Sequence, residues 1–179
     1  SAAAAADRRR VVLVAFPLHE PQSQWLLSAL LEDLQHPVVM DGEAEPVQFV
    51  LKLHPSLPLR RFWRRPLALP PWIVLGERPM NEVLAEADLM VYAGPTSSWW
   101  EAMLAGVPVM KYQPDLLDLE AGHELEGLSV RCCTGTTLRA AITACLREGG
   151  EKQVVPDDVV QRLCTRVDER VWLTLTEPH

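Results

Sequence analysis

The sequence predicts an α/β fold: a single doubly wound parallel sheet of about six strands with helices on both faces. Short apolar runs rich in β-branched residues, such as residues 9–17, are typical of strands buried on both faces of a parallel sheet. Helical segments follow most of these runs, and this alternation indicates right-handed βαβ units. With 179 residues, the chain is long enough for one such domain with its own core.

Each element has its own signal. Leu26, Leu30 and Leu34 recur at helical spacing, which predicts an amphipathic helix, and Gly106 stands where a helix would end at its C′ position. The expected strands are residues 9–17, 47–55, 71–76, 88–94, 107–112 and 128–133. The expected helices are residues 21–35, 79–87, 97–106, 136–150 and 156–175, with residues 57–66 irregular or briefly helical.

Composition excludes several classes of protein. The formal net charge of -7 argues against a general nucleic-acid binder, which needs a basic face. The four cysteines form no CxxC motif, so we expect reduced thiols, as in the cytoplasm. No apolar run approaches the roughly 20 residues of a membrane helix, and the scattered histidines predict no metal site. Residues 1–9 are interpreted as a tag or linker, and residues 10–179 as one domain.

Polar residues follow several of the expected strands. Ligands of open α/β sheets bind at the carboxyl ends of the strands, and a glycine and hydroxyls before a helix N-terminus favour an anion there. No GxGxxG, P-loop or GxSxG motif is present, which disfavours a dinucleotide enzyme, an NTPase or a serine hydrolase. The candidate ligand-edge residues are His19, Glu20, Lys52, His54, Pro55, Gly94, Thr96, Ser97, Ser98, Glu101 and Lys111.

Structural interpretations compete with these functional ones. Ser98 and Glu101 fit a capping box, in which the serine caps the helix and the glutamate reaches back to its N–H. His54 with Pro55 fits the end of a strand, and the paired tryptophans fit core packing. The arginines at positions 60, 61, 64 and 65 fit a solvated face, or else contact with anionic lipid or a charged acceptor.

Residues 80–110 carry a resemblance to a known family. An Ala-Asp pair precedes a strand, a Gly/Ser/Thr-rich turn follows it, and E-A-x-x-x-G-x-P-V comes next, from Glu101 to Val109. This order resembles the donor-binding half of GT-B fold glycosyltransferases, which is a Rossmann-like domain. The His54-Pro55 pair and the Thr96-Ser97-Ser98 turn are most similar to bacterial capsule enzymes, namely sialyltransferases and polysialyltransferases. The glycerophosphate transferases of teichoic-acid synthesis have a similar domain.

The resemblance implies a glycosyltransferase domain in bacterial surface-polysaccharide synthesis, with a CMP-sugar donor such as sialic acid or a Kdo-like sugar and no further cofactor. It implies that Lys52, His54, Pro55, Gly94, Thr96, Ser97, Ser98 and Glu101 bind the donor, the histidine and hydroxyls at the CMP and the glutamate at the ribose. His19, Glu20 and Lys111 are candidate members of an interdomain cleft, and no general base is identified. The implied location is cytoplasmic, with peripheral contact to the inner membrane as a further expectation.

One departure from the family is the domain count. GT-B enzymes have two such domains, with the acceptor on the N-terminal one, whereas this sequence predicts one. The resemblance therefore implies a missing N-terminal domain or a separate subunit, and a polysaccharide or lipid-linked acceptor. Two alternatives stay open. One is half of a sugar-nucleotide 2-epimerase, which shares the fold but usually takes UDP, and the other is a non-catalytic assembly module.

Overall fold

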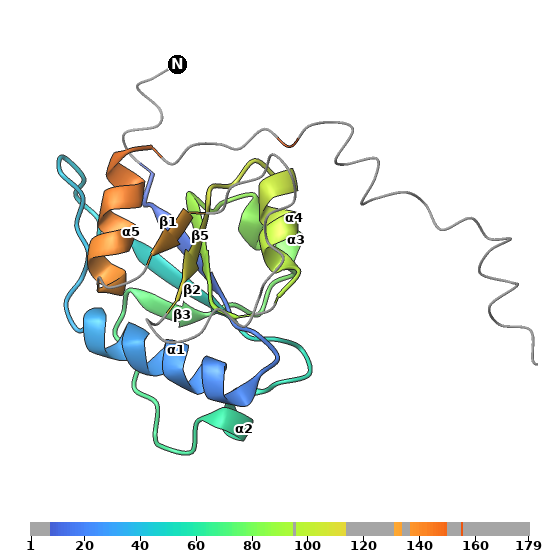
Figure 1. Ribbon diagram of the computed structural model, residues 1–179. Helices are drawn as coiled ribbons and strands as arrows, with labels where there is room; N and C mark the ends of the chain where they lie inside the picture. The colour runs from blue at the N-terminus through green and yellow to red at the C-terminus, as the bar shows by residue number, and fades with distance from the viewer. Residues whose placement is uncertain (1–7, 95, 114–130, 134–136, 150–154, 156–179) are drawn as a thin grey trace, which may run out of the picture.

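A computed structural model describes residues 8–94, 96–113, 131–133, 137–149 and 155, and for residues 131–133 it describes the backbone alone. Its centre is a parallel sheet of six strands in the order β3-β2-β1-β4-β5-β6 (Figure 1). The strands are β1 (Val11–Ala15), β2 (Gln48–Lys52), β3 (Ile73–Leu75), β4 (Leu89–Tyr92), β5 (Val109–Tyr112) and β6 (Arg131–Cys133). The predicted doubly wound parallel sheet is therefore confirmed.

Helices cover both faces of the sheet. One face carries α1 (Glu20–Asp33) and α5 (Leu138–Arg147), with the short α2 (Leu59–Phe62) beside α1. The other face carries α3 (Met80–Leu84) and α4 (Ser98–Leu104). No helix among the described residues is both long enough and apolar enough to cross a membrane.

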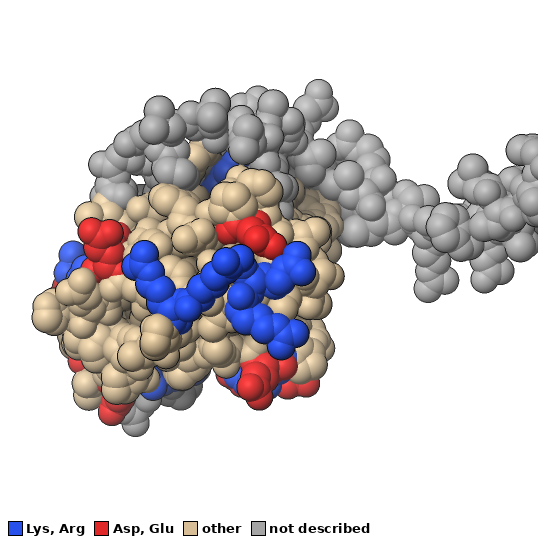
Figure 2. Space-filling model, turned by 90° about the horizontal axis from the view of Figure 1, so that it is seen from below, with Lys and Arg blue, Asp and Glu red and all other residues tan. Residues whose placement is uncertain are grey.

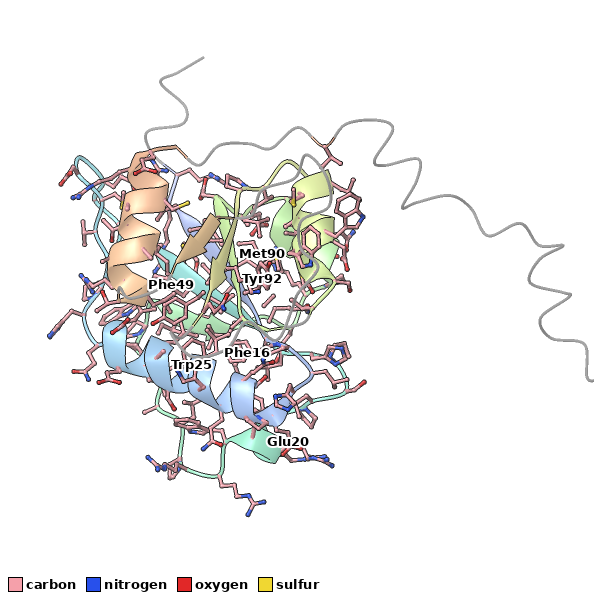
Figure 3. All side chains as sticks on the ribbon, in the orientation of Figure 1. Phe16, Glu20, Trp25, Phe49, Met90 and Tyr92 are labelled. Atoms are coloured by element: carbon pink, nitrogen blue, oxygen red, sulfur yellow. The ribbon has the colours of Figure 1, made fainter. Side chains whose placement is uncertain are left out.

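The sheet separates two cores, because successive side chains of a strand point to opposite faces. Phe16 and Phe49 pack with the side chains of α1 and α5, whereas Met90 and Tyr92 pack with those of α3 and α4 (Figure 3). All strand residues from Val12 to Ala15 are almost fully buried. This explains why the central strands read as continuous apolar runs instead of alternating ones.

The ends of the elements depart from the predicted bounds by a few residues. Helix α1 begins at Glu20 after His19, and the buried Ser23 hydroxyl donates to the Pro17 carbonyl at 2.8 Å, which closes the loop from β1. Gly106 has φ +70° and follows the end of α4, as a C′ glycine should. The predicted helix 156–175 and residues 128–130 of the last strand lie outside the described residues.

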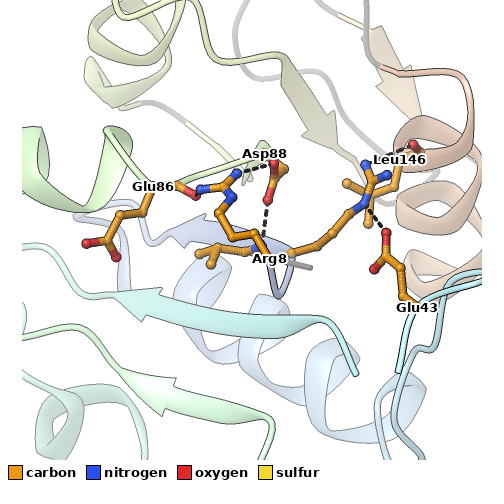
Figure 4. A network of polar contacts seen from close by, with 7 residues as sticks. Arg8, Glu43, Glu86, Asp88 and Leu146 are labelled. Atoms are coloured by element: carbon orange, nitrogen blue, oxygen red, sulfur yellow. Dashed lines mark hydrogen bonds and ion pairs between the residues drawn. The ribbon is translucent and has the colours of Figure 1, made fainter. Parts of the chain in front are cut away.

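A polar network ties the amino edge of the sheet together (Figure 4). Asp88, just before β4, accepts the backbone N–H of Val11 at 2.8 Å and pairs with Arg8 at 2.5 Å. Arg10 donates to Glu43 at 2.6 Å and to the carbonyl of Leu146 at 3.4 Å. The aspartate of the Ala-Asp pair thus aligns β1 with β4, at the edge opposite the carboxyl ends of the strands.

Two residues of the expected tag or linker, residues 1–9, contact the sheet and its loops. Arg8 binds Asp88 and the Glu86 carbonyl, and Arg9 donates to the Pro46 carbonyl at 2.8 Å. Nothing in their local sequence distinguishes them from a basic linker, because their partners are far away along the chain.

We expect Asp88→Ala to lower the free energy of unfolding by about 1–3 kcal/mol, because the Val11 N–H loses its acceptor and Arg8 loses its ion pair. Chemical denaturation would measure this. Asp41→Ala is the matched control, since Asp41 also pairs with an arginine, Arg147 at 3.2 Å, but on an exposed surface. An exposed pair contributes about 0–1 kcal/mol. Equal losses in the two variants would contradict the structural role of Asp88.

Candidate functional site

A cleft of about 770 Å³ opens at the carboxyl edge of the sheet. Its walls come from the segments after β1, β2 and β4 and from the loop before α3. It is lined by Phe16, Leu18, Lys52, Leu53, His54, Pro55, Pro79, Met80, Thr96, Ser97, Ser98 and Glu101. The cleft therefore contains every predicted donor-binding residue except Gly94. Phe16 and Met80, two apolar residues of the lining, were not predicted, because the sequence places each inside an expected strand or helix, residues 9–17 and 79–87.

Gly94 does not line the cleft, but it allows the turn after β4 to pack against α1. Its φ of +67° lies in the left-handed region that favours glycine. A Cβ built there would lie only 2.1 Å from Oε1 of Gln22, in the first turns of α1. The absence of a side chain thus lets the turn after β4 pack closely against α1.

In the turn of Thr96, Ser97 and Ser98 at the start of α4, some hydroxyls form hydrogen bonds within the protein and one is exposed to solvent. The Thr96 hydroxyl donates to Ser98 Oγ at 3.1 Å and accepts the Ser98 backbone N–H at 3.3 Å. Thr96 therefore satisfies the first amide of the helix. The Ser97 hydroxyl is exposed and has no hydrogen-bond partner in the part of the chain that the structure describes.

The capping box, which was the competing structural interpretation of Ser98 and Glu101, does not form. Helix α4 begins at Ser98 with Ser97 at the N-cap position, and no side chain of the N-cap residue accepts a helix amide. Glu101 does not reach back, because Thr96 already occupies the Ser98 N–H. Within the described ranges the exposed Glu101 carboxylate has neither a hydrogen-bond nor an ion-pair partner, and it lies on the wall of the cleft.

His54 has one ring nitrogen bound and one available. Its Nδ1 accepts the backbone N–H of Ser56 at 3.1 Å, which fixes the loop after β2. A neutral imidazole that accepts at Nδ1 carries its proton on Nε2. Nε2 has no partner among the residues placed by the structure, so its N–H is available to an acceptor in the cleft.

The Lys52 ammonium contacts backbone carbonyls at the side of the cleft. Nζ donates to the carbonyls of Gly76 and Arg78, so it connects the loop after β3 to the end of β2.

The same loop carries an exposed ion pair. Arg78 donates to Glu86 with both terminal guanidinium nitrogens, at 2.8 and 2.6 Å. That hydrogen bond holds the pKa of the Glu86 carboxyl below its usual range. The stabilisation of the folded state by this ion pair is therefore present at neutral pH, and it is lost as the pH falls through the lowered pKa of Glu86.

The three other candidate residues do not line this cleft. His19 is exposed at the N-cap of α1, and Glu20 pairs with Arg61 at 3.2 Å on the adjoining surface. Lys111 lies within β5 and is 4% exposed. None of the three lines the cleft. Among the described residues, no group of three or more His, Cys, Asp or Glu side chains could hold a metal ion.

Comparison with known proteins identifies the fold. No protein-family model matches the chain, and no curated protein matches its sequence. The glycosyltransferase of kitacinnamycin matches with a TM-score of 0.51 and 20% identity, over 89% of this chain and 38% of that one. ALG13, solved by NMR, matches with a TM-score of 0.53 and 12% identity, over 88% and 95%. The glycosyltransferase SnogD from Streptomyces nogalater matches with a TM-score of 0.38 and 22% identity, over 59% and 26%.

Identities at this level establish the fold alone. The chain spans 38% of the kitacinnamycin enzyme and 26% of SnogD, but 95% of the solved ALG13 chain. The same fold thus occurs as one part of a longer glycosyltransferase and as nearly the whole of a shorter chain. The chain described here has the Rossmann-like α/β fold of such a glycosyltransferase half.

Proposed function

We propose that the chain is the donor-binding domain of a glycosyltransferase and that it binds a nucleotide-sugar in the 770 Å³ cleft. The observation that carries this proposal is the set of uncommitted polar groups on the cleft. Glu101, the Ser97 hydroxyl and Nε2 of His54 come from two strand ends, line the same cleft, and have no partner within the described chain. The fold shared with the kitacinnamycin glycosyltransferase and ALG13 supports the proposal.

The chemistry of the three groups suits the parts of a nucleotide. A carboxylate accepts hydrogen bonds from ribose hydroxyls, whereas an imidazole N–H and a serine hydroxyl donate to phosphate oxygens. Arranged this way, the ribose lies near α4 and the phosphate lies between the loops after β2 and β4. The apolar side chains of Phe16, Leu18 and Met80 complete a cleft of the kind that small ligands occupy.

The finer proposal is a CMP-sugar donor in bacterial surface-polysaccharide synthesis. It rests on the His54-Pro55 pair and the Thr-Ser-Ser turn, which resemble those of the capsule sialyltransferases. Glycosyl transfer then requires an acceptor-binding half, either on the same chain or on a separate subunit. The acceptor would be a polysaccharide or a lipid-linked sugar. The domain by itself should bind the donor and catalyse little.

A thermal-shift panel of CMP, CDP, UMP, UDP and GDP tests this proposal. A ligand at about 100 times its Kd stabilises the folded state by roughly 2.7 kcal/mol, so even weak binding is measurable. Stabilisation by CMP above the other nucleotides supports the CMP-sugar proposal. Preference for UDP favours the 2-epimerase alternative, and no stabilisation by any nucleotide favours the assembly module.

We expect His54→Asn to weaken CMP binding about tenfold or more, because a hydrogen bond to a charged group contributes about 1.5–3 kcal/mol. The asparagine Oδ1 can still accept the Ser56 N–H in an Asx turn, so the loop should keep its shape. The variant therefore keeps the loop acceptor but replaces the Nε2 donor by the amide of a shorter side chain, which does not reach as far into the cleft. Calorimetric titration with CMP measures the loss, and an unchanged melting temperature checks the fold. CMP affinity equal to wild type would restrict His54 to its role in the loop.

We expect Glu101→Gln to remove the preference for a ribose with free hydroxyls. The wild type should bind CMP about tenfold more tightly than 2′,3′-dideoxy-CMP, since the carboxylate accepts from those hydroxyls. In the variant the two affinities should approach each other. Glu82→Gln is the matched control, because Glu82 is exposed in the first turn of α3 and does not line the cleft. A preference retained in Glu101→Gln would exclude ribose binding by this residue.

A further inference from the structure

A second concavity, of about 310 Å³, lies outside the proposed donor cleft. We name it the arginine pocket; it is lined by Arg61, Arg64, Arg65, Phe62, Trp63 and the first turns of α1, where Glu20 lies. Figure 2 views the molecule from below, the side where α1 and α2 lie in Figure 1, and shows basic side chains gathered on this face. Helix α2 and the residues after it supply the arginines.

The backbone that carries these arginines is held by the core. Phe62 is 6% exposed, and its ring stacks on Phe16 with centroids 6.0 Å apart. Trp63 packs against the same core, and its backbone N–H donates to the Leu59 carbonyl at 2.9 Å. Arg61 therefore directly precedes this anchored pair of aromatic residues, and Arg64 and Arg65 directly follow it, so all three arginines lie close to a point where the chain is held by the core.

The charge of the pocket is incompletely balanced. Arg61 pairs with Glu20. Within the part of the chain that the structure describes, Arg60, Arg64 and Arg65 have no carboxylate partner. Yet the chain as a whole carries a net charge of -7. Arginines that repel one another, in a protein with many available carboxylates, favour an external anion. The planar guanidinium fork suits phosphate oxygens in particular, because it donates two parallel hydrogen bonds.

The pocket adjoins the proposed donor cleft. Phe16 and Leu18 line the cleft, while Glu20 and Pro21, a few residues further along, line the pocket. In the same way the loop after β2 first passes the cleft and then leads into α2. Two concavities thus lie on either side of shared chain segments, so two ligands could be held next to each other.

We propose that the arginine pocket is a second anion site, which binds the phosphate or pyrophosphate group of a ligand other than the nucleotide donor. Arg64 and Arg65 supply the uncompensated charge, and Arg61 exchanges part of its contact with Glu20 for the ligand. The phosphate can belong to a soluble compound or to a lipid headgroup. Binding here stands on the charge and shape of the pocket and does not require nucleotide binding in the cleft.

Calorimetric titration with inorganic pyrophosphate, at about 0.15 M salt to screen distant charges, tests the site. We expect Arg64→Gln and Arg65→Gln each to weaken binding about tenfold, which corresponds to roughly 1.4 kcal/mol. Arg60→Gln is the matched control: it removes the same charge from the same segment but outside the pocket lining, and should change the affinity less than about twofold. Glu20→Gln should tighten binding, because a carboxylate that repels the anion is removed. An unchanged melting temperature checks each variant.

A second arm identifies the source of the phosphate. Cosedimentation with phosphatidylcholine vesicles that contain phosphatidylglycerol should depend on Arg64 and Arg65 but not on Arg60 if the ligand is a lipid headgroup. Binding of pyrophosphate without vesicle binding assigns the site to a soluble phosphate compound. Equal losses in Arg60→Gln and Arg64→Gln would reveal diffuse attraction and overturn the proposal. So would a lack of binding in both arms, or pyrophosphate binding that is lost in His54→Asn but not in the arginine variants.

Discussion

The structure depends on the reversal of strand order between β1 and β4. These strands are neighbours in the sheet, but the chain leaves β1 toward the α1 face and leaves β4 toward the α4 face. The two connections therefore part at the carboxyl edge and leave a crevice, which is the usual ligand position in a doubly wound sheet. The 770 Å³ cleft lies there. Gly94 sets how closely the two sides approach, since any side chain at that position would meet Gln22.

Polar groups at the two edges of the sheet do different work. At the amino edge the carboxylates stabilise the fold: Asp88 binds Arg8 and the Val11 N–H, and Glu43 binds Arg10. At the carboxyl edge some groups also stabilise the fold, because the Lys52 ammonium and the Thr96 hydroxyl each satisfy neighbouring backbone atoms. The other polar groups at this edge, above all the Glu101 carboxylate, have no hydrogen-bond partner in the described structure. Residue type alone would not distinguish the polar groups that stabilise the fold from those available to a ligand, whereas their hydrogen-bond partners do.

The sequence predicts the sheet well because buried parallel strands leave a strong local signal. It also predicts which residues follow the strands, and hence most of the polar lining of the cleft. It fails where two hydrogen-bonding patterns compete, or where the partner is far away along the chain. Ser98 and Glu101 have the spacing of a capping box, but Thr96, two residues before Ser98, accepts the same amide. Arg8 pairs with Asp88, 80 residues away, and no local pattern indicates that contact.

The two concavities at the carboxyl edge share one partition, and that partition is apolar. Phe16 lines the proposed donor cleft, Phe62 lines the arginine pocket, and their rings stack against each other at an interplanar angle of 27°. Both rings are almost fully buried, so the wall belongs to the core beneath α1 and is not a mobile loop. A close-packed core transmits a displacement on one side to the other. Anything that moves this aromatic pair should therefore alter both concavities together, whereas the polar groups on their rims act on one concavity at a time.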